Sequence, residues 1–429
     1  MVASAKQEWI TDIKEIASSQ NRPPNLVDYL LLETDIYENR IPKGLNDYIS
    51  LICHRDLTKA IAPIIGGITN RYARKIEDDL VGETVLFAVR NSPAYRKKYK
   101  AHLGINDSER LANWVKKEIT SSEDLTKLPT ITNTDLKYPK EGAAYWYIPG
   151  KAFKRRYQTG GTTTGKSPSK IPYSHVDDEV ATLISCAGLI KYAEVKEGQK
   201  ALSLAPGYPH AFGPKLQDSL ERLGVCCDSR HFAPQTPEDL LALIDRERPS
   251  YDILIGAPHG PKGATGSLDV LKATDDTKGT DIFQNNLRDS TIIVGGAPIT
   301  RDLLNELYKE VGAGLVVNGY GSAQMMGYFD RLDLDGDSGG YRSSIDIPLG
   351  YWIVHPTEDE SVPARFSKGL FTVLGREIMP IINYDPNDIL KINNSKITDL
   401  CRAEWFKQEE DGSWKVVIPV NAGTCASAV

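Results

Sequence analysis

The alternation of short apolar runs with longer amphipathic segments between residues 153 and 320 constrains the fold more than any other feature. The short runs are typical of buried strands, and the longer segments carry apolar residues at the three- and four-residue spacing of helices. Strands are predicted at 201–205, 252–255, 290–294 and 315–318, and helices at 174–193, 213–223, 237–247 and 301–311. This alternation predicts an α/β fold with a largely parallel sheet covered by helices.

The regions on either side of this core have different patterns. Helical periodicity dominates the first 150 residues, whereas several short strands are predicted beyond residue 340. A chain of 429 residues is long enough for two or three domains. We therefore expect a mostly helical N-terminal region at 1–150 that packs on the core, an α/β core at 151–340 and a strand-rich part at 341–429.

Composition and charge argue against several classes of protein. The formal net charge is −6, and phosphate contacts of nucleic-acid binders need clustered Lys and Arg. The chain has no run of 18 apolar residues, and its N-terminus lacks the apolar core of a signal peptide. Six scattered cysteines without a CxxC pair suggest neither a zinc ribbon nor a disulfide framework. We expect a cytoplasmic protein, monomeric or homodimeric, that binds neither nucleic acid nor membrane.

A glycine- and threonine-rich segment at 157–170 is the most informative part of the sequence. It reads YQTGGTTTGKSPSK and lies between a predicted strand and the helix from Ser174. Glycines let backbone N–H groups converge on an anion, and hydroxyls and a lysine add donors and positive charge. The segment therefore predicts a phosphate-binding loop. Its candidate phosphate contacts are Thr159, Gly160, Gly161, Thr162, Thr163, Thr164, Gly165 and Lys166.

Two other interpretations of this segment stay open. From Gly160 the spacing also satisfies the G-x-x-x-x-G-K-[ST] pattern of a Walker A loop. That loop should open a helix at once, and Pro168 and Pro172 would interrupt such a helix. The other interpretation is a flexible polar loop that binds nothing.

The segment resembles the phosphate-binding loop of the acyl-activating, adenylate-forming enzymes, commonly written T-S-G-T-T-G-x-P-K. The run 159–163, Gly165, Pro168 and Lys170 supply its elements, and the loop is one or two residues longer here. Further downstream, IIVGGAPI at 292–299 resembles the family's strand and glycine turn at the adenine pocket. The sequence NGYGSAQ that begins at residue 318 is similar to the family's N-x-Y-G-x-T-E.

A fourth segment points to one branch of that family. REIMPIINYDPNDI at 376–389 resembles T-R-E-A-M-P-L-I-R-Y-R-T-G-D-I of the phenylacetate-CoA ligase branch. Weaker similarities at 91–96, 128–132 and 207–224 follow in the same order, so the resemblance covers about residues 90 to 390.

The resemblance implies ATP-dependent activation of a carboxylic acid to an acyl-adenylate, with release of pyrophosphate. Tyr320 would pack on adenine, and the two oxygens of Asp388 would accept hydrogen bonds from the ribose hydroxyls. Thr159, Thr162, Thr163 and Lys166 would be the catalytic phosphate contacts, and Gln324, where the family has Glu, would be a neutral ligand for Mg²⁺. The remaining implied nucleotide contacts are Gly295, Gly296, Ala297, Asn318, Gly319, Gly321 and Ser322, and the implied acid contacts are Tyr208, His210 and Phe212.

The acceptor in the second step stays open. Members of this family usually carry a small C-terminal domain after the ribose-binding Asp, and here residues 389–429 alone follow Asp388. We therefore expect that mobile domain to be reduced or absent. Coenzyme A is the acceptor that the resemblance implies. An amine, a carrier-protein thiol, and a non-catalytic role in binding nucleotides or acyl groups are the alternatives.

Overall fold

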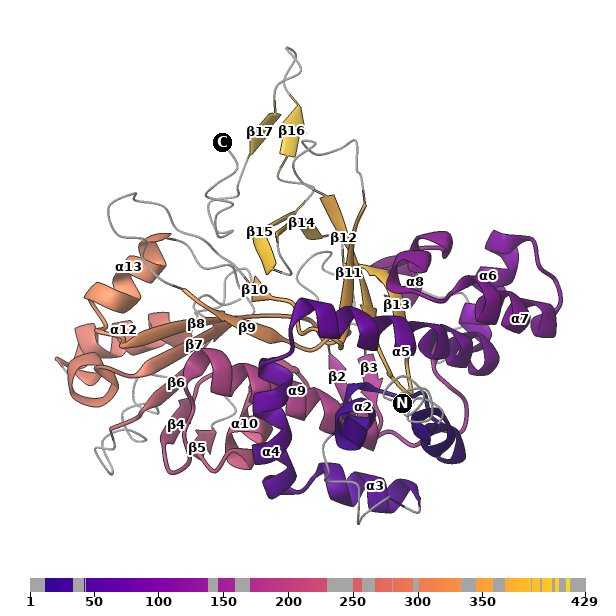
Figure 1. Ribbon diagram of the computed structural model, residues 1–429. Helices are drawn as coiled ribbons and strands as arrows, with labels where there is room; N and C mark the ends of the chain where they lie inside the picture. The colour runs from indigo at the N-terminus through magenta and orange to yellow at the C-terminus, as the bar shows by residue number, and fades with distance from the viewer. Residues whose placement is uncertain are drawn as a thin grey trace.

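The computed structural model describes residues 12–33, 42, 44–137, 146–158, 170–229, 250–256, 267–279, 281–295, 301–332, 345–357, 367–386, 388–393, 396–402, 406–408 and 414–416. Within these ranges the chain has a mixed α/β architecture, with two larger sheets, two strand pairs and surrounding helices (Figure 1). The predicted α/β fold class is confirmed. The division of the chain at residues 150 and 340 stays a prediction.

The first sheet has six strands among the described residues, in the order β5-β4-β6-β7-β8-β9. All neighbouring pairs are parallel except β8 and β9, which are antiparallel. The alternating pattern predicted four of these strands, β4, β6, β7 and β8, which have mainly aliphatic sequences. It missed β5 and β9, whose sequences CCDS and YFDR lack an aliphatic run. The strands are β4 (Lys200–Ser203), β5 (Cys226–Ser229), β6 (Ile253–Gly256), β7 (Thr291–Gly295), β8 (Leu315–Tyr320) and β9 (Tyr328–Arg331).

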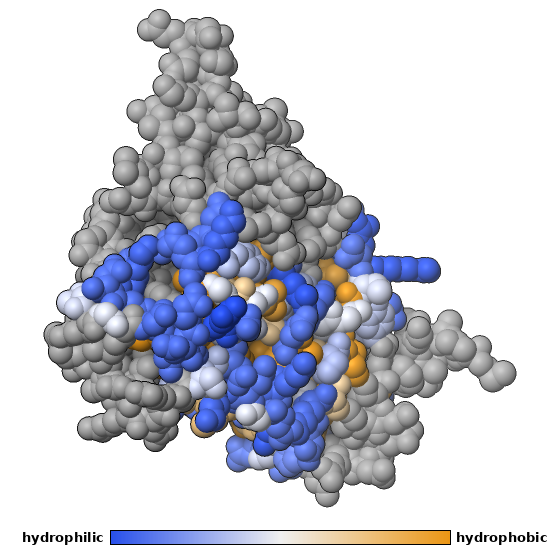
Figure 2. Space-filling view, turned by 90° about the vertical axis from the view of Figure 1, so that its left-hand side faces the viewer, coloured by the Kyte–Doolittle hydropathy of each residue, from blue (hydrophilic) through white to orange (hydrophobic). Residues whose placement is uncertain are grey.

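Helices cover both faces of this sheet because successive strand residues point to opposite faces. Ile293 and Val317 belong to a large core with α4 (Arg55–Gly66), α9 (His175–Ala193) and α10 (Phe212–Arg222). Their neighbours Ile292 and Val316 belong to a second, smaller core with α12 (Ser267–Lys278) and α13 (Arg301–Lys309). The helix α9 begins with a capping box in which Ser174 and Asp177 bond each other's backbone N–H groups. The surface on the α12 and α13 side is mainly hydrophilic, with apolar residues visible only between polar ones (Figure 2).

Before the hairpin at residue 155, the described chain is mostly helical. It forms a helix at 12–19 and then α2 (Leu26–Glu33), α3 (Leu45–Ile52), α5 (Asn70–Asn91), α6 (Pro93–Leu103), α7 (Ser108–Glu118), a 3₁₀ turn η2 (Ser122–Lys127) and α8 (Asn133–Lys137). The continuous pattern at 79–103 is two helices, because Pro93 lacks the N–H that a continuing helix would need and instead opens α6.

The second sheet has seven strands in the described part of the chain. Its order is β1-β13-β12-β14-β15-β10, with β11 also paired to β12. Short strands were predicted beyond residue 340, and one of them, which the sequence places at 378–382, begins only at Ile381 in the structure. The carboxylate of Asp177 accepts the backbone N–H groups of Glu377 and Ile378, which keeps these residues out of the strand. The strands are β1 (Ile131–Thr132), β10 (Ile345–Asp346), β11 (Trp352–Thr357), β12 (Ser367–Val373), β13 (Ile381–Asp385), β14 (Asp388–Asn393) and β15 (Lys396–Arg402).

Two small features complete the described elements. A π-helical turn η4 (Phe283–Leu287) precedes β7, and a hairpin of β16 (Phe406–Gln408) and β17 (Trp414–Val416) stands above the second sheet (Figure 1). No helix within the described ranges is long and apolar enough to cross a membrane.

Candidate functional site

The first sheet has a switch in strand order beside β4. The chain runs from β4 outward to β5 and then crosses back to β6 on the other side of β4. In open α/β sheets the crevice at the carboxyl ends of the strands, next to such a switch, is the usual ligand site. The turn that leaves β4 there contains Tyr208, His210 and a cis peptide bond between Tyr208 and Pro209.

Two glycines at the carboxyl ends of β7 and β8 are in close contact with Phe212, the first residue of α10. A methyl group on Gly295 would lie 2.5 Å from Cε2 of the Phe212 ring and 3.0 Å from the carbonyl oxygen of Gly319. A methyl group on Gly319 would lie 3.1 Å from the same ring carbon. These positions therefore need glycine, because the half-buried Phe212 ring packs directly against the carboxyl ends of both strands.

Tyr320 and Asp388 connect the two sheets at this edge. The Tyr320 hydroxyl donates a hydrogen bond to Oδ2 of Asp388 over 2.7 Å. The Tyr320 ring packs edge-on against Trp352, with ring centroids 6.4 Å apart. It also packs against Phe371 in a tilted arrangement, with centroids 6.2 Å apart. Residues 68 positions apart, at the end of β8 and the start of β14, thus share one site.

The glycine- and threonine-rich loop begins and ends on the hairpin of β2 (Arg155–Gln158) and β3 (Lys170–Tyr173). Gln158 is paired with Lys170, so both ends of the loop emerge side by side. The N–H of Gln158 donates to the carbonyl oxygen of Pro209 over 2.7 Å, which brings the start of the loop to the turn that leaves β4. The candidate residues 159–166 themselves lie outside the described residues, as do Gly296 and Ala297.

A buried charge cluster joins β2, α9 and α10 beneath this hairpin. The fully buried carboxylate of Asp178 accepts from Lys215 and, over 3.1 Å, from the Tyr157 hydroxyl, and it lies 3.0 Å from the ammonium of Lys154. Burial opposes ionisation of Asp178, but the Lys215, Lys154 and Arg155 charges outweigh it and lower its pKa to about 2. The cluster ties the strand that enters the loop to the helix that carries Phe212.

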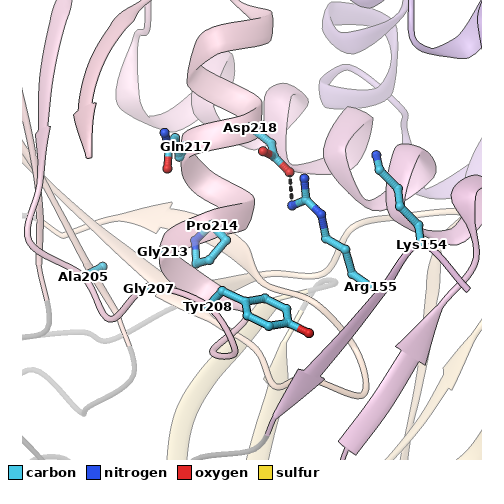
Figure 3. A pocket seen from close by; sticks show the side chains of 9 residues that line it. All are labelled: Lys154, Arg155, Ala205, Gly207, Tyr208, Gly213, Pro214, Gln217 and Asp218. Atoms are coloured by element: carbon cyan, nitrogen blue, oxygen red, sulfur yellow. Dashed lines mark hydrogen bonds and ion pairs between the residues drawn. The ribbon is translucent and has the colours of Figure 1, made fainter. Parts of the chain in front are cut away.

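Tyr208 lines a cavity of about 360 Å³ between β2 and α10 (Figure 3). Its side chain is 56% exposed. The ion pair of Arg155 with Asp218 closes one side of this cavity. Lys154, Ala205, Gly207, Gly213, Pro214 and Gln217 line the remainder.

The structure thus brings many of the predicted residues together, in two groups. Tyr208, His210 and Phe212 share the turn into α10, where the exposed His210 donates its N–H to the Gly207 carbonyl over 3.0 Å. Gly295, Asn318, Gly319, Tyr320, Gly321 and Ser322 lie at the carboxyl ends of β7 and β8, and Asp388 joins them through Tyr320. Tyr208 and Phe212 face different spaces, although the sequence placed both at one acid pocket.

Comparisons with solved structures show what this arrangement resembles. A crystal structure of 2-hydroxyisobutyryl-CoA ligase in the postadenylation state with 2-HIB-AMP superposes with a TM-score of 0.60 at 14% identity, over 81% of this chain and 70% of that one. The same ligase with 2-HIB-AMP and CoA gives a TM-score of 0.55 at 15% identity, over 83% of this chain and 65% of that one. The chain has the fold of an adenylate-forming ligase. No protein-family model and no curated protein sequence matches it.

The share of the ligase that this chain matches shows how much of the ligase fold is present. The chain spans about 65% of the length of the ligase in its CoA complex. The comparison therefore establishes the fold of this chain. Whether the chain shares the activity and the acceptor of the longer ligase is a matter for the proposal below.

The Mg²⁺ ion that the resemblance implies does not fit the residues at its expected position in this ligase fold. Gln324 is 1% exposed and supplies an amide instead of a carboxylate. In the described part of the chain no three His, Cys, Asp or Glu side chains gather into a metal site. The nearby carboxylate of Asp177 already accepts three backbone N–H groups, from Ser174, Glu377 and Ile378. A protein-held Mg²⁺ ion would need at least one free carboxylate here.

Sequence reasoning missed Arg376, Asp178 and Lys215. Arg376 donates to the carbonyl oxygens of Gln324 and, over 3.1 Å, of Pro172, and so ties the second sheet to the loop hairpin. Its position directly before Glu377 in the fourth resembled segment was a signal that could have identified it. Asp178 and Lys215 gave no comparable signal, because charged residues on predicted helices usually belong to solvated faces.

Proposed function

We propose that this chain activates a carboxylic acid with ATP, forming an acyl-adenylate and pyrophosphate. The observation that carries the proposal is the 2.7 Å hydrogen bond between Tyr320 and Asp388. It joins an aromatic ring and a carboxylate at the carboxyl ends of a parallel sheet, where a nucleoside needs a surface for its base and acceptors for its sugar hydroxyls. The ligase fold supports the same assignment.

In the proposed first step, a carboxylate oxygen of the acid attacks the α-phosphorus of ATP while the bond to pyrophosphate breaks. Such a reaction depends on positioning and on compensation of charge rather than on covalent help from the protein. We assign the phosphates to the loop at 159–166, with Thr159, Thr162, Thr163 and Lys166 as donors. We assign the ribose to Asp388 and the base to Tyr320.

The acid is assigned to the crevice beside Phe212, between α10 and the glycines at 295 and 319. In the second step a nucleophile attacks the acyl carbon and AMP leaves. The CoA bound in the compared ligase supports a thiol acceptor for this chain, and coenzyme A is our first choice. The phenylacetate-CoA ligase branch remains a proposal that rests on the sequence at 376–389. We also propose that the enzyme is cytoplasmic. A carrier-protein thiol or an amine is the alternative acceptor.

The decisive experiment is carboxylate-dependent exchange of labelled pyrophosphate into ATP, with a panel of aliphatic and aromatic acids. An adenylating enzyme catalyses exchange with at least one acid, and Asp388→Asn should reduce it. A protein that only binds nucleotides or acyl groups would give no exchange with any acid, and the proposal would then be wrong. Mass analysis of products formed with coenzyme A or an amine would identify the acceptor.

A further inference from the structure

Three buried polar atoms next to the candidate site have no hydrogen-bond partner in the described structure. They are Oε1 and Nε2 of Gln324 and Nε of Arg376. Both residues are almost fully buried, at 1% and 3% exposure. An unsatisfied buried polar atom costs about 1–3 kcal/mol. Two of these atoms, Nε2 of Gln324 and Nε of Arg376, are donors that one anionic ligand would satisfy, whereas Oε1 is an acceptor and needs a donor such as water.

The backbone around Gln324, in contrast, is well satisfied. The carbonyl oxygens of residues 323, 324 and 325 accept, respectively, from the Tyr173 hydroxyl over 2.9 Å, from Arg376, and from the Trp352 indole over 3.0 Å. The segment is therefore held in place by three different elements. The buried side-chain amide takes no part in this support.

The charge at this position favours an anion. The Arg376 guanidinium lies 4.0 Å from the centre of the Tyr173 ring, and its two terminal nitrogens donate to backbone carbonyls. Of the two acidic residues near it, Asp177 accepts backbone N–H groups and Glu377 is paired with Lys151. The guanidinium charge thus has no hydrogen-bonded carboxylate among the described residues. Nε of Arg376 and Nε2 of Gln324 are donors that an anionic oxygen would satisfy.

The position also indicates which anion this is. Gln324 follows Tyr320 by four residues, and Arg376 contacts Pro172 of β3, the strand that leaves the glycine- and threonine-rich loop. An anion beside both the nucleoside contacts and that loop is a phosphate group of the nucleotide.

We propose that Gln324 and Arg376 hold a phosphate oxygen of ATP directly, without a metal ion between protein and phosphate; this inference rests on the proposed function. A carboxylate at position 324 would repel a phosphate unless a divalent cation lay between them. A neutral amide donates to the phosphate itself. Gln324 therefore makes the affinity of this chain for ATP largely independent of Mg²⁺, and Gln324→Glu would make it dependent.

The test is the equilibrium affinity for ATP of the full chain, measured by calorimetry with excess Mg²⁺ and with excess EDTA. For the wild type we expect the affinity to fall by less than about tenfold when Mg²⁺ is removed. For Gln324→Glu we expect a loss of about 100-fold in EDTA that added Mg²⁺ restores. The exposed amide Gln284, whose Nε2 donates to the Glu310 carbonyl over 3.4 Å, provides the matched control: Gln284→Glu should behave like the wild type.

The buried carboxylate of Gln324→Glu could prevent folding, and the midpoint of thermal unfolding would show this. A second variant keeps the inference testable in that case. Gln324→Leu removes the donor without adding charge, and it should weaken ATP binding about tenfold equally with and without Mg²⁺. Equal affinity of Gln324→Leu and wild type would overturn the inference, and so would a wild type that binds ATP only with Mg²⁺. Absence of ATP binding under every condition would instead refute the proposed function itself, and this inference with it.

Discussion

At the scale of single residues, Tyr320 makes two kinds of contact, one through its ring and one through its hydroxyl. Tyr320 packs on Trp352 and Phe371 through its ring and binds Asp388 through its hydroxyl. The two roles can be separated by substitution, because removing the hydroxyl leaves the ring in place. The proposed site thus makes different predictions for the hydroxyl and the carboxylate.

We predict that Asp388→Asn raises the KM for ATP in pyrophosphate exchange by about 10- to 100-fold, since a neutral amide is a poorer double acceptor for a diol. Tyr320→Phe should raise it less than Asp388→Asn does, because it removes one hydrogen bond to the carboxylate, of about 1.5–3 kcal/mol, and leaves both acceptor oxygens for the ribose. Exchange kinetics with ATP varied at saturating acid would measure both. A larger effect of Tyr320→Phe than of Asp388→Asn would contradict the proposed division of roles.

The order of motifs along the sequence was sufficient to predict Tyr320 and Asp388 as parts of one site, and the structure places them in contact. The sequence could not predict that the side chains of Tyr208 and Phe212 have different surroundings, because the two residues are only four positions apart. The turn through Pro209 and the start of α10 direct one into the cavity and the other onto the glycines. Side-chain direction depends on that local geometry, which composition and spacing do not determine.

At the scale of elements, the buried cluster around Asp178 determines how β2, α9 and α10 fit together. The helices predicted at 174–193 and 213–223 nearly match α9 and α10, because apolar periodicity is local information. The helix predicted at 237–247 lies outside the described residues. Asp178 and Lys215 lie on two different helices and are 37 positions apart in the sequence. No local sequence pattern predicts that they form a pair. The cluster could not be predicted for that reason, although it supports both the loop and Phe212.

The cluster predicts a specific dependence of stability on pH. The pKa of Asp178 is lowered to about 2 in the folded chain, against about 3.9 in an unfolded one. Its contribution to folding, roughly 2–3 kcal/mol, is therefore fully present above about pH 4 and is lost as the pH falls toward 2. Urea unfolding between pH 5 and pH 2 should show the stability gap between wild type and Asp178→Asn narrowing. A gap independent of pH would contradict the assignment.

A partner substitution tests the same cluster from the other side. We predict that Lys215→Met lowers the free energy of unfolding by about 3–5 kcal/mol, since it leaves the Asp178 carboxylate buried without its closest cation. Adding Asp178→Asn to it should recover part of the loss, which denaturant unfolding would measure. Full additivity of the two losses would mean that the residues do not interact.

The contact between Gly295 and Phe212 gives a prediction about packing. Gly295→Ala should lower the free energy of unfolding by about 1–3 kcal/mol, because the added methyl would lie 2.5 Å from the ring. Phe212→Ala in the same chain should relieve that clash. Gly44→Ala is the matched control, because Gly44 has extended backbone and no heavy atom within 4 Å of the added methyl. Thermal unfolding of these three variants and the wild type would test this packing.

At the scale of the whole molecule, the two hydrophobic cores differ in extent. The larger core includes residues of the N-terminal helices, α9 and both sheets, whereas the smaller one lies between the first sheet and the helices α12 and α13. The alternating sequence pattern predicted α9, α10 and α13 on the first sheet but not α12. It could not predict that one core would extend through both sheets, because that depends on long-range packing.

The unequal cores should respond differently to the same substitution. Leu183 in α9 and Leu304 in α13 are both fully buried, and either change to Ala should cost about 2–5 kcal/mol. We expect Leu304→Ala to reduce hydrogen-exchange protection in α12, α13 and the first sheet only. Leu183→Ala should reduce it in both sheets. Identical exchange patterns for the two variants would show that the cores unfold as one unit.

The hairpin of β2 and β3 has a consequence for how this chain tolerates evolutionary change. Because Gln158 and Lys170 are neighbours in the strand pair, the span between them is fixed, whatever number of residues connects them. The entropy of closing such a span grows only with the logarithm of the number of residues, so one or two additional residues cost about 0.1–0.2 kcal/mol. Changes of length between these two anchors are therefore nearly neutral for the entropy of folding, which leaves the length of the segment open to selection for other properties.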